Sequence, residues 1–430
     1  MNEYRRSRAR HVLAFVLAAC GGVLISLLVA NFGLGDKQID TALGRLHATA
    51  EPQFMRNMAG LLGPDFTKGN RVQELINGDE IFTSMLSDMR SARRSITLET
   101  YIFFAGSISG EFVDVMAERA RAGVKVLVLL DWVGGQLDDA QIERMQQSGI
   151  EVRRYRPPRW NNLHKLNNRT HRKLLVVDGS IGFTGGVGIA DKWRGNALDP
   201  SQWRDTHFRV TGPVVAQMQA TFADNWLEAT GEALHGPDFM PLLPPAGEEL
   251  AQMYSASPGG GARSMQLIYL LSIAAARHTI DISASYFVPD EAAVAELVAA
   301  MERGVRVRIV LPGRHIDWSI LRHASRARWG PLLEAGAQIH EYQPTMYHVK
   351  MMIVDDLWVT VGSTNFDPRS FAINDEANLD VYDHPFAQRQ TAVFERDLEK
   401  SRHVTLHEWQ QRPWHDKALD FAASLIGSQL

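Results

Sequence analysis

The chain has 430 residues, of which 45% are hydrophobic and 22% are charged, and its formal net charge is −4. This composition is that of a folded protein and excludes extensive disorder. The length suits two domains or one large pseudo-symmetric unit. The slightly negative charge excludes an overall basic field for nucleic acid. Cys20 is the only cysteine, so an intrachain disulfide is excluded and nothing supports a zinc site.

The N-terminus is predicted to form a separate unit. Arginines in a basic tail at 1–11 precede an apolar run at 12–34, which only Gly, Ser and Asn interrupt. A helix of roughly 20 such residues spans the ~30 Å hydrocarbon core of a bilayer. We therefore expect a single-pass transmembrane anchor at 12–34 in an inner membrane, with a cytoplasmic N-terminus and the body on the far, periplasmic side. The alternatives are a cleaved signal, because residues 17–20 resemble a lipoprotein cleavage box, and a buried helix.

Residues 35–70 are predicted to be a polar linker with a helical stretch at 40–58, and the first half of the body is expected at 71–240. Its apolar periodicity alternates between strand and helix. The predicted order is strand 71–76, helix 80–92, strand 95–103, helix 110–122, strand 124–131, helix 138–148, strand 151–155 and an apolar strand from about 171.

The second half, 263–430, follows an inter-half linker at 241–262 that is rich in Pro, Gly and Glu, and it repeats this order. The prediction is helix 264–276, strand 279–287, helix 291–303, strand 305–312, helix 318–334, strand 338–342 and a second apolar strand. Such alternation is typical of an α/β fold. We expect two pseudo-symmetric α/β sandwich halves, each a mixed sheet flanked by helices.

One pattern, His-x-Lys-x4-Asp, occurs once in each half. Its copies are His171, Lys173 and Asp178, and His348, Lys350 and Asp355. On a strand, residues i and i+2 share a face, so each histidine projects beside its lysine. A single match is typical of a solvated edge strand, whereas two matches in similar apolar surroundings indicate a function.

The chemistry of these residue types indicates phosphoryl transfer. A lysine beside a histidine repels a metal cation, but it can hold the non-bridging oxygens of a phosphodiester. One neutral imidazole can attack phosphorus, and a second, protonated imidazole can protonate the leaving alkoxide. We therefore predict a site at the junction of the halves that uses two histidines and two lysines, with no metal and no other cofactor.

A catalytic histidine also needs a partner on its other ring nitrogen. Asp205 and Glu376 each follow their motif and each open a strand-like run. We expect Asp205 to orient His171 and Glu376 to orient His348, and the alternative is a solvated acid at a strand start. Asp178 and Asp355 are interpreted as turn caps that support the site without taking part in transfer.

These motifs resemble those of the phospholipase D superfamily and, within it, the bacterial cardiolipin synthases. The second copy continues as Gly-Ser-Thr-Asn at 362–365, as the family motif does. The first copy reads Gly-Gly-Val-Gly at 185–188, so Gly188 stands where the family usually has asparagine. The resemblance implies that Ser363 and Asn365 contact phosphate.

The resemblance further implies a membrane-anchored phosphatidyltransferase. Such enzymes move a phosphatidyl group from phosphatidylglycerol to a hydroxyl of a second lipid through a covalent phosphohistidine, without a metal. His171 as nucleophile follows family habit, because the sequence is symmetric in this respect. A hydrolase acting on phospholipids is the first alternative. A phosphodiesterase or nuclease of the same superfamily is the second, although the anchor and the net charge argue against a nucleic-acid partner.

Overall fold

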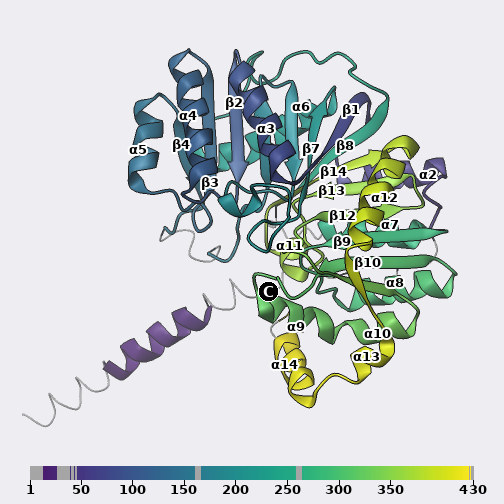
Figure 1. Ribbon diagram of the computed structural model, residues 1–430. Coiled ribbons are helices and arrows are strands. Elements are labelled where there is room, and N and C mark those ends of the chain that lie inside the picture. Colours follow the sequence, from purple (N-terminus) through teal and green to yellow (C-terminus); the bar gives the residue numbers. More distant parts are fainter. Residues whose placement is uncertain are drawn as a thin grey trace, which may run out of the picture.

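The computed structural model describes residues 13–26, 39, 43, 46–159, 166–257, 264–425 and 427. Its strands form one continuous mixed sheet in the order β15-β11-β10-β9-β12-β13-β14-β8-β1-β7-β6-β5-β2-β3-β4. The two halves meet where β8 pairs with β1 (Figure 1). The prediction of an α/β fold with mixed sheets flanked by helices is confirmed.

The first half contains the strands β1 (Thr67–Ile76), β2 (Ser95–Thr100), β3 (Lys125–Asp131), β4 (Glu151–Tyr155), β5 (Lys173–Val177), β6 (Ile181–Gly185) and β7 (Thr206–Thr211). Its helices are α3 (Asn77–Ser91), α4 (Ser107–Arg121), α5 (Asp139–Gln147) and α6 (Val214–Thr230), with a 3-10 turn, η2 (Asp191–Trp193). Helices α3, α4 and α5 cover one face of the sheet, and α6 covers the other (Figure 1).

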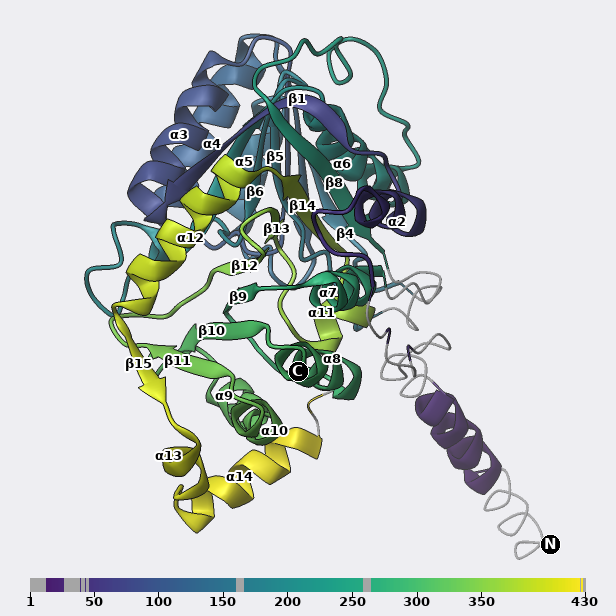
Figure 2. The same ribbon diagram turned by 90° about the vertical axis from the view of Figure 1, so that its right-hand side faces the viewer.

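The second half contains the strands β8 (Glu249–Ala256), β9 (Thr279–Ala284), β10 (Arg306–Pro312), β11 (Gln338–Tyr342), β12 (Lys350–Val354), β13 (Trp358–Gly362), β14 (Glu376–Tyr382) and β15 (Ser401–Val404). Its helices are α7 (Ser264–Ala275), α8 (Glu291–Glu302), α9 (Ser319–Ala327), α10 (Trp329–Glu334), α11 (Pro368–Ala372), α12 (His384–Leu398), α13 (Leu406–Gln410) and α14 (Trp414–Leu425). The predicted helix 318–334 is therefore divided into α9 and α10. Helix α12 packs on the face opposite to α7 and α8 (Figure 2).

The halves repeat each other in detail. Strands β2, β3 and β4 run parallel, as do β9, β10 and β11, while each motif strand is antiparallel to its neighbours. Gly123 and Gly304 occupy equivalent positions between helix and strand, with φ of 91° and 90°. This left-handed conformation favours glycine, which explains why the same helix-end signal appears twice.

A hydrophobic core shared by both halves lies beneath the motif strands. It joins α6 residues such as Met218 to α12 residues such as Phe394, together with Val176 of β5 and Met351 of β12. Because the side chains of one half pack directly on the other, the halves form a single rigid scaffold for the site.

Two predicted linkers include regular structure. The range 241–262 contains β8, which pairs with β14 as well as β1, so it forms the centre of the sheet. The range 35–70 contains α2 (Pro52–Leu62) and the start of β1, and its helix begins later than predicted. The Pro- and Gly-rich composition of 241–262 predicts a linker, but pairing with β1 and β14 stabilises a strand there, because tertiary pairing overrides local propensity.

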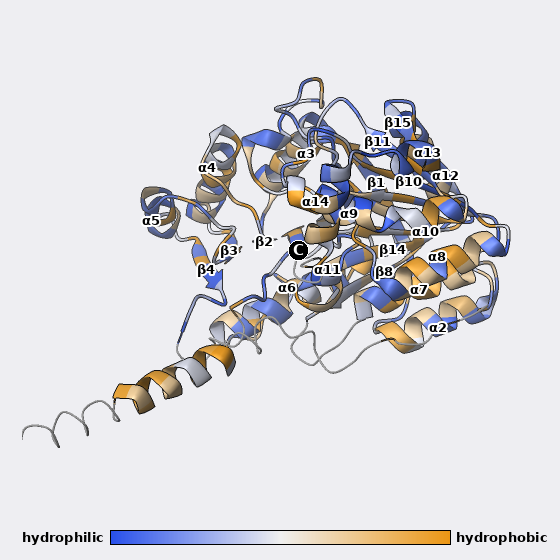
Figure 3. Cartoon of the chain, turned by 90° about the horizontal axis from the view of Figure 1, so that it is seen from below, coloured by the Kyte–Doolittle hydropathy of each residue, from blue (hydrophilic) through white to orange (hydrophobic). Residues whose placement is uncertain are grey.

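The predicted tail, 1–11, and parts of the predicted anchor, 12 and 27–34, lie outside the described residues. Residues 13–26 form a helix with exposed apolar side chains, such as Phe15 and Leu17, which stands away from the body (Figure 3). Within the described ranges, no helix combines the length and the hydropathy that a bilayer crossing requires.

Candidate active site

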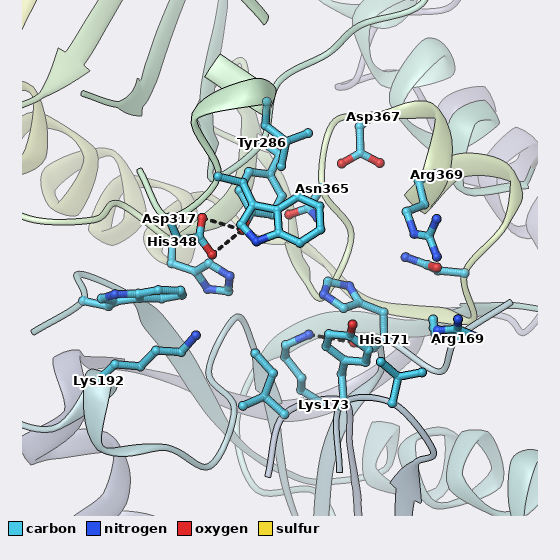
Figure 4. A pocket seen from close by; sticks show the side chains of 18 of the residues that line it. Arg169, His171, Lys173, Lys192, Tyr286, Asp317, His348, Asn365, Asp367 and Arg369 are labelled. Atoms are coloured by element: carbon cyan, nitrogen blue, oxygen red, sulfur yellow. Dashed lines mark hydrogen bonds between the residues drawn. The ribbon is translucent and has the colours of Figure 1, made fainter. Parts of the chain in front are cut away.

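A cavity of about 450 Å³ opens at the junction of the halves, and both motif histidines line it. Lys173 also lines the cavity, together with Asn365 from the loop after β13 (Figure 4). A volume of this size is typical of a small-molecule site. The two copies of the motif, which are far apart in the sequence, therefore face one shared space.

Each histidine is held by a carboxylate from the opposite half. His171 Nδ1 lies 3.0 Å from Glu376 Oε1, and His348 Nδ1 lies 2.8 Å from Asp205 Oδ2. The expected pairing of Asp205 with His171 and of Glu376 with His348 is therefore wrong. Both acids do contact a motif histidine, but the pairs cross between the halves.

The backbone explains the crossing. The amide of His171 donates to the carbonyl of Asp375, and the amide of His348 donates to the carbonyl of Arg204, both at 2.8 Å. Each contact belongs to a short parallel bridge between the halves, at Thr170 with Asp375 and at Arg204 with Tyr347. Glu376 directly follows Asp375, and Asp205 directly follows Arg204. Each orienting acid therefore lies next to the histidine of the opposite half.

Burial keeps both imidazoles neutral. It lowers the pKa of His171 to about 4, even though the charge of Glu376 opposes this shift. Burial also lowers the pKa of His348 well below its ordinary value, and the Lys350 ammonium adds to the effect. A neutral imidazole beside a carboxylate donates from Nδ1, which leaves Nε2 as the acceptor nitrogen. In His348, the Lys350 Nζ lies 3.2 Å from Nε2.

The two orienting acids differ in their surroundings. Burial acts to raise the pKa of Glu376, but its contact with His171, together with the Lys173 ammonium and the hydrogen bond from Ser363, outweighs burial, so the net pKa is lowered and the group is ionised. Burial raises the pKa of Asp205 to about 7. The Trp193 indole N–H donates to Asp205 Oδ2 at 3.0 Å. The halves are therefore similar in geometry but different in charge.

The motif lysines are anchored by the backbone next to their histidines. Lys173 Nζ donates to the carbonyl of His171 at 2.8 Å, and Lys350 Nζ donates to the carbonyl of His348 at 3.0 Å and to Ser285 Oγ at 2.6 Å. Burial lowers the pKa of Lys173 to about 7, assisted by Lys350, and burial lowers the pKa of Lys350 to about 8. An anionic phosphate between them would relieve this repulsion and favour both charged forms.

Ser363 and Asn365 have different places. Asn365 lines the cavity, and its side-chain oxygen accepts a hydrogen bond from Ser285 Oγ at 2.8 Å. Ser363 is buried, and its hydroxyl donates to Glu376 Oε2. The implied phosphate contact is thus compatible with Asn365, whereas Ser363 is placed to position Glu376.

Glycines replace both residues in the first half. A Cβ added at Gly186, the counterpart of Ser363, would lie 2.4 Å from Asp205 Oδ1. At Gly188, the counterpart of Asn365, a Cβ would lie 2.8 Å from Ile102 Cβ. Contacts of this length do not occur without movement, so the packing around Asp205 and Ile102 favours glycine and leaves this side of the cavity without an amide.

Asp178 and Asp355 lie outside the cavity, at the ends of β5 and β12. Both have a φ of 53°. Each carboxylate accepts backbone N–H groups at the start of the neighbouring strand, from residues 93–95 and 277–279 respectively. These bonds tie the motif hairpin to β2 or β9, which agrees with their interpretation as supports.

The structure adds residues that line the cavity, and one, Trp193, that packs behind it, all of which sequence reasoning missed. Trp193 and Trp203 lie with ring centroids 5.3 and 5.1 Å from that of His348, and Tyr101 lies 5.3 Å from His171. Tyr286 donates to both oxygens of Asp317, at 2.8 and 2.9 Å. Tyr101 and Tyr286 follow β2 and β9, the strands that neighbour the motif strands. Their similar positions in the two repeated halves could have indicated that both lie near the site. The others come from loops, whose direction no periodicity predicts.

The basic stretch at 153–172 serves more than one purpose. Arg156 forms salt bridges with Glu228 and Asp375, and Arg172 is buried with its guanidinium on the carbonyl of Thr221. Arg169, in contrast, lines the cavity. Part of the positive charge that would suit nucleic acid is therefore internal to the fold.

Comparisons with known proteins agree with the site. Residues 85–226 and 269–398 match the family described as "Cardiolipin synthase, PLD-like domain". The chain is 34% identical over 360 residues to a cardiolipin synthase of Geobacillus kaustophilus (strain HTA426), covering 83% of this chain and 72% of the relative. It is 33% identical over 341 residues to cardiolipin synthase A of Pseudomonas syringae pv. syringae (strain B728a), covering 79% and 71% respectively.

Among solved structures, phosphatidylserine synthase from Haemophilus influenzae Rd KW20 superposes with a TM-score of 0.69 at 15% identity, covering 88% of this chain and 99% of that one. At this identity the likeness shows the fold alone. The family match and the sequence relatives cover both halves, including the doubled motif. The chain therefore belongs to the cardiolipin synthase family of the phospholipase D superfamily, a family of phosphatidyltransferases.

Proposed function

We propose that this protein joins two phospholipids by moving a phosphatidyl group from phosphatidylglycerol to a hydroxyl of a second lipid. The group is carried on a histidine, and no metal takes part. The observation that carries the proposal is the pair of buried, neutral histidines that line one cavity with Nδ1 fixed by carboxylates. The cardiolipin synthase relatives support the choice of lipid.

In the first step, His171 Nε2 attacks the donor phosphorus, and the bond from phosphorus to the head-group oxygen breaks. His348 protonates the departing alkoxide. Burial and the neighbouring lysine charges lower the pKa of His348, and the anion of a bound donor phosphate opposes both effects, which favours the protonated form that this step requires. Lys173, Lys350 and Asn365 hold the non-reacting phosphate oxygens.

In the second step, the now neutral His348 removes a proton from the incoming lipid hydroxyl. The lipid oxygen forms a bond to phosphorus, and the bond from phosphorus to His171 breaks, returning its electron pair to Nε2. Water in place of the lipid hydroxyl would release phosphatidic acid. The ratio of transfer to hydrolysis therefore depends on how well the cavity retains the acceptor.

The choice of His171 as nucleophile follows from its partner. Glu376 is ionised and accepts hydrogen bonds from both His171 and Ser363. A fixed anion on Nδ1–H stabilises the positive imidazole ring that forms when Nε2 binds phosphorus. His348 pairs instead with Asp205, whose pKa is raised to about 7, which suits a residue that takes up and returns a proton.

Exposed apolar side chains near the cavity support a lipid substrate. Trp318, 60% exposed, lines the cavity at the start of α9. Helix α14 packs against α9 and exposes Trp414, Phe421 and Leu425. Together with an anchor at 12–34 in the inner membrane and the body on the periplasmic side, this surface would hold the cavity close to the bilayer.

Mass spectrometry of lipid products from phosphatidylglycerol liposomes tests the proposal. We expect cardiolipin to form with the purified protein and to form equally well in excess chelator. Absence of cardiolipin, or its complete loss with chelator, would overturn the proposal. Phosphatidic acid as the main product, unaffected by an added primary alcohol, would instead identify a hydrolase.

A further inference from the structure

Lys192 lines the cavity beside His348 but has no part in the chemistry above. Its Nζ lies 3.7 Å from the ring centroid of Trp203 and 4.7 Å from that of Trp193. The same two indoles lie against the ring of His348, and Lys192 and His348 are found on the same side of the cavity (Figure 4). The ammonium and the imidazole therefore share one aromatic wall.

The Lys192 ammonium differs from the other cations of the cavity. Lys173 is bonded to a backbone carbonyl, and Arg169 and Arg369 donate to the loop at 166–168. Within the described part of the chain, Lys192 Nζ forms neither a hydrogen bond nor a salt bridge, and it lies over three aromatic rings. Cation–π contacts hold an ammonium in place without neutralising it. Such a partly buried charge is therefore available to an anionic ligand.

The backbone of Lys192 is fixed on both sides. The Asp191 carboxylate accepts the amides of Ser107 and Ile108 at the start of α4, and the Trp193 indole is bonded to Asp205. The carbonyl of Lys192 accepts the amide of Trp203 at 2.6 Å. A side chain on so rigid a turn is preorganised, which is a requirement of a specific binding site.

The position of Lys192 on the His348 side indicates which phosphate it would meet. Lys173 and Lys350 bind the reacting phosphate in the proposed mechanism, so Lys192 is not needed for that phosphate. The entering oxygen lies at His348, which removes its proton. In a phosphoglycerol head group, a three-carbon unit separates that hydroxyl from the lipid's own phosphate. A second phosphate that extends from His348 away from Lys173 would meet Lys192, which lines the cavity there.

We propose that Lys192 binds the phosphate of the acceptor head group, so that the enzyme selects an acceptor that carries a phosphoglycerol over a neutral alcohol. This inference rests on the proposed transfer function and assigns a residue that recognises the acceptor. The Tyr286 hydroxyl donates a bifurcated hydrogen bond to the two oxygens of Asp317. The Asp317 carboxylate, held in this way, accepts a hydrogen bond from the second hydroxyl of the acceptor's glycerol. Burial lowers the pKa of Lys192 to about 8, opposed by Asp317, so the ammonium remains mainly charged at neutral pH.

Two soluble acceptors that differ only in a phosphate test the proposal. Phosphatidylglycerol donor is supplied with either isotope-labelled glycerol 3-phosphate or isotope-labelled glycerol, and kcat/KM is measured for each acceptor from the labelled lipid formed, because transfer to unlabelled glycerol would only regenerate the donor. We expect wild type to prefer glycerol 3-phosphate, and Lys192→Met to lose about tenfold or more of that preference. Lys192→Arg keeps the positive charge and should therefore retain most of the preference for glycerol 3-phosphate. Lys125→Met, an exposed lysine paired with Asp238 far from the cavity, is the matched control.

Because the readout is a ratio between acceptors, a general loss of activity or of folded protein cancels. No preference in wild type, or an equal fall with both acceptors in Lys192→Met, overturns the role of Lys192. If wild type prefers glycerol 3-phosphate in a Lys192-dependent way but forms no cardiolipin, the anion site stands and the proposed lipid-to-lipid transfer fails. If wild type forms cardiolipin without that preference, the transfer stands and the anion site at Lys192 fails.

Discussion

Asp205, from the first half of the chain, lies with its Oδ2 2.8 Å from Nδ1 of His348 in the second half. Glu376 and His171 form the reciprocal pair at 3.0 Å. Neither half therefore contains a complete histidine–carboxylate pair. The site exists only when the halves are packed on their shared core.

The crossed pairs predict which mutations are coupled. Asp205→Asn should lower kcat by about 10²- to 10⁴-fold, because the amide no longer fixes the tautomer and charge of His348. Adding Asp205→Asn to His348→Ala should then lower kcat only a little further. Adding Asp205→Asn to His171→Ala tests the alternative pairing of Asp205 with His171. A double-mutant cycle on kcat measures both couplings. Additive losses for Asp205 with His348 would contradict the role derived from the geometry.

The two histidines should respond differently to a better leaving group. With a natural donor, His171→Ala and His348→Ala should each reduce transfer by at least about 10³-fold. A p-nitrophenyl phosphodiester needs no general acid, so His348→Ala should still form a phosphohistidine with it, while His171→Ala should not. Intact-protein mass spectrometry detects the adduct. An adduct on His348 would reverse the assignment of roles.

The lysines predict an alkaline limit to activity. The lowered pKa values of about 7 for Lys173 and about 8 for Lys350 mean that both lose their positive charge as pH rises through this range. We therefore expect kcat/KM, which reports the free enzyme, to fall above pH 7 to 8. A bound phosphate anion raises both pKa values, so the corresponding fall in kcat should occur at higher pH. A kcat/KM profile that stays flat to pH 9 would contradict this.

Asp178 and Asp355 should matter for stability and not for chemistry. Each carboxylate accepts amides at the start of a neighbouring strand, so Asp178→Ala or Asp355→Ala leaves several N–H groups without a partner. We expect a loss of about 1–3 kcal/mol in the free energy of unfolding for each, measured with urea. Activity per folded molecule should stay within about twofold of wild type. A much larger loss of kcat at full stability would place these residues in the mechanism.

The proposed anchor has a direct test. Deleting residues 1–45 removes the exposed apolar helix at 13–26 and leaves the body from α2 onward. We expect the full chain to sediment with membranes after a high-salt wash and the shortened chain to appear mainly in the supernatant. Equal membrane retention of both would assign binding to the body, for which the exposed apolar residues of α14 are the first candidates.

The amino-acid sequence by itself determined the local elements and the chemistry. Continuous apolar runs predict the two motif strands, and the alternating side-chain direction of a strand places His171 beside Lys173 and His348 beside Lys350. The repeated helix and strand signals predict two equivalent halves. These features were predictable because they depend on neighbours within a few residues. The residue types then restrict the chemistry to phosphoryl transfer.

Only the tertiary structure decided which half supplies each partner. The crossing of Asp205 and Glu376, the placement of β8 in the middle of the sheet and the approach of Lys192 to His348 all depend on contacts between residues far apart in the chain. Local periodicity carries no information on such contacts, because it specifies the face on which a side chain projects and leaves open which distant segment packs against that face.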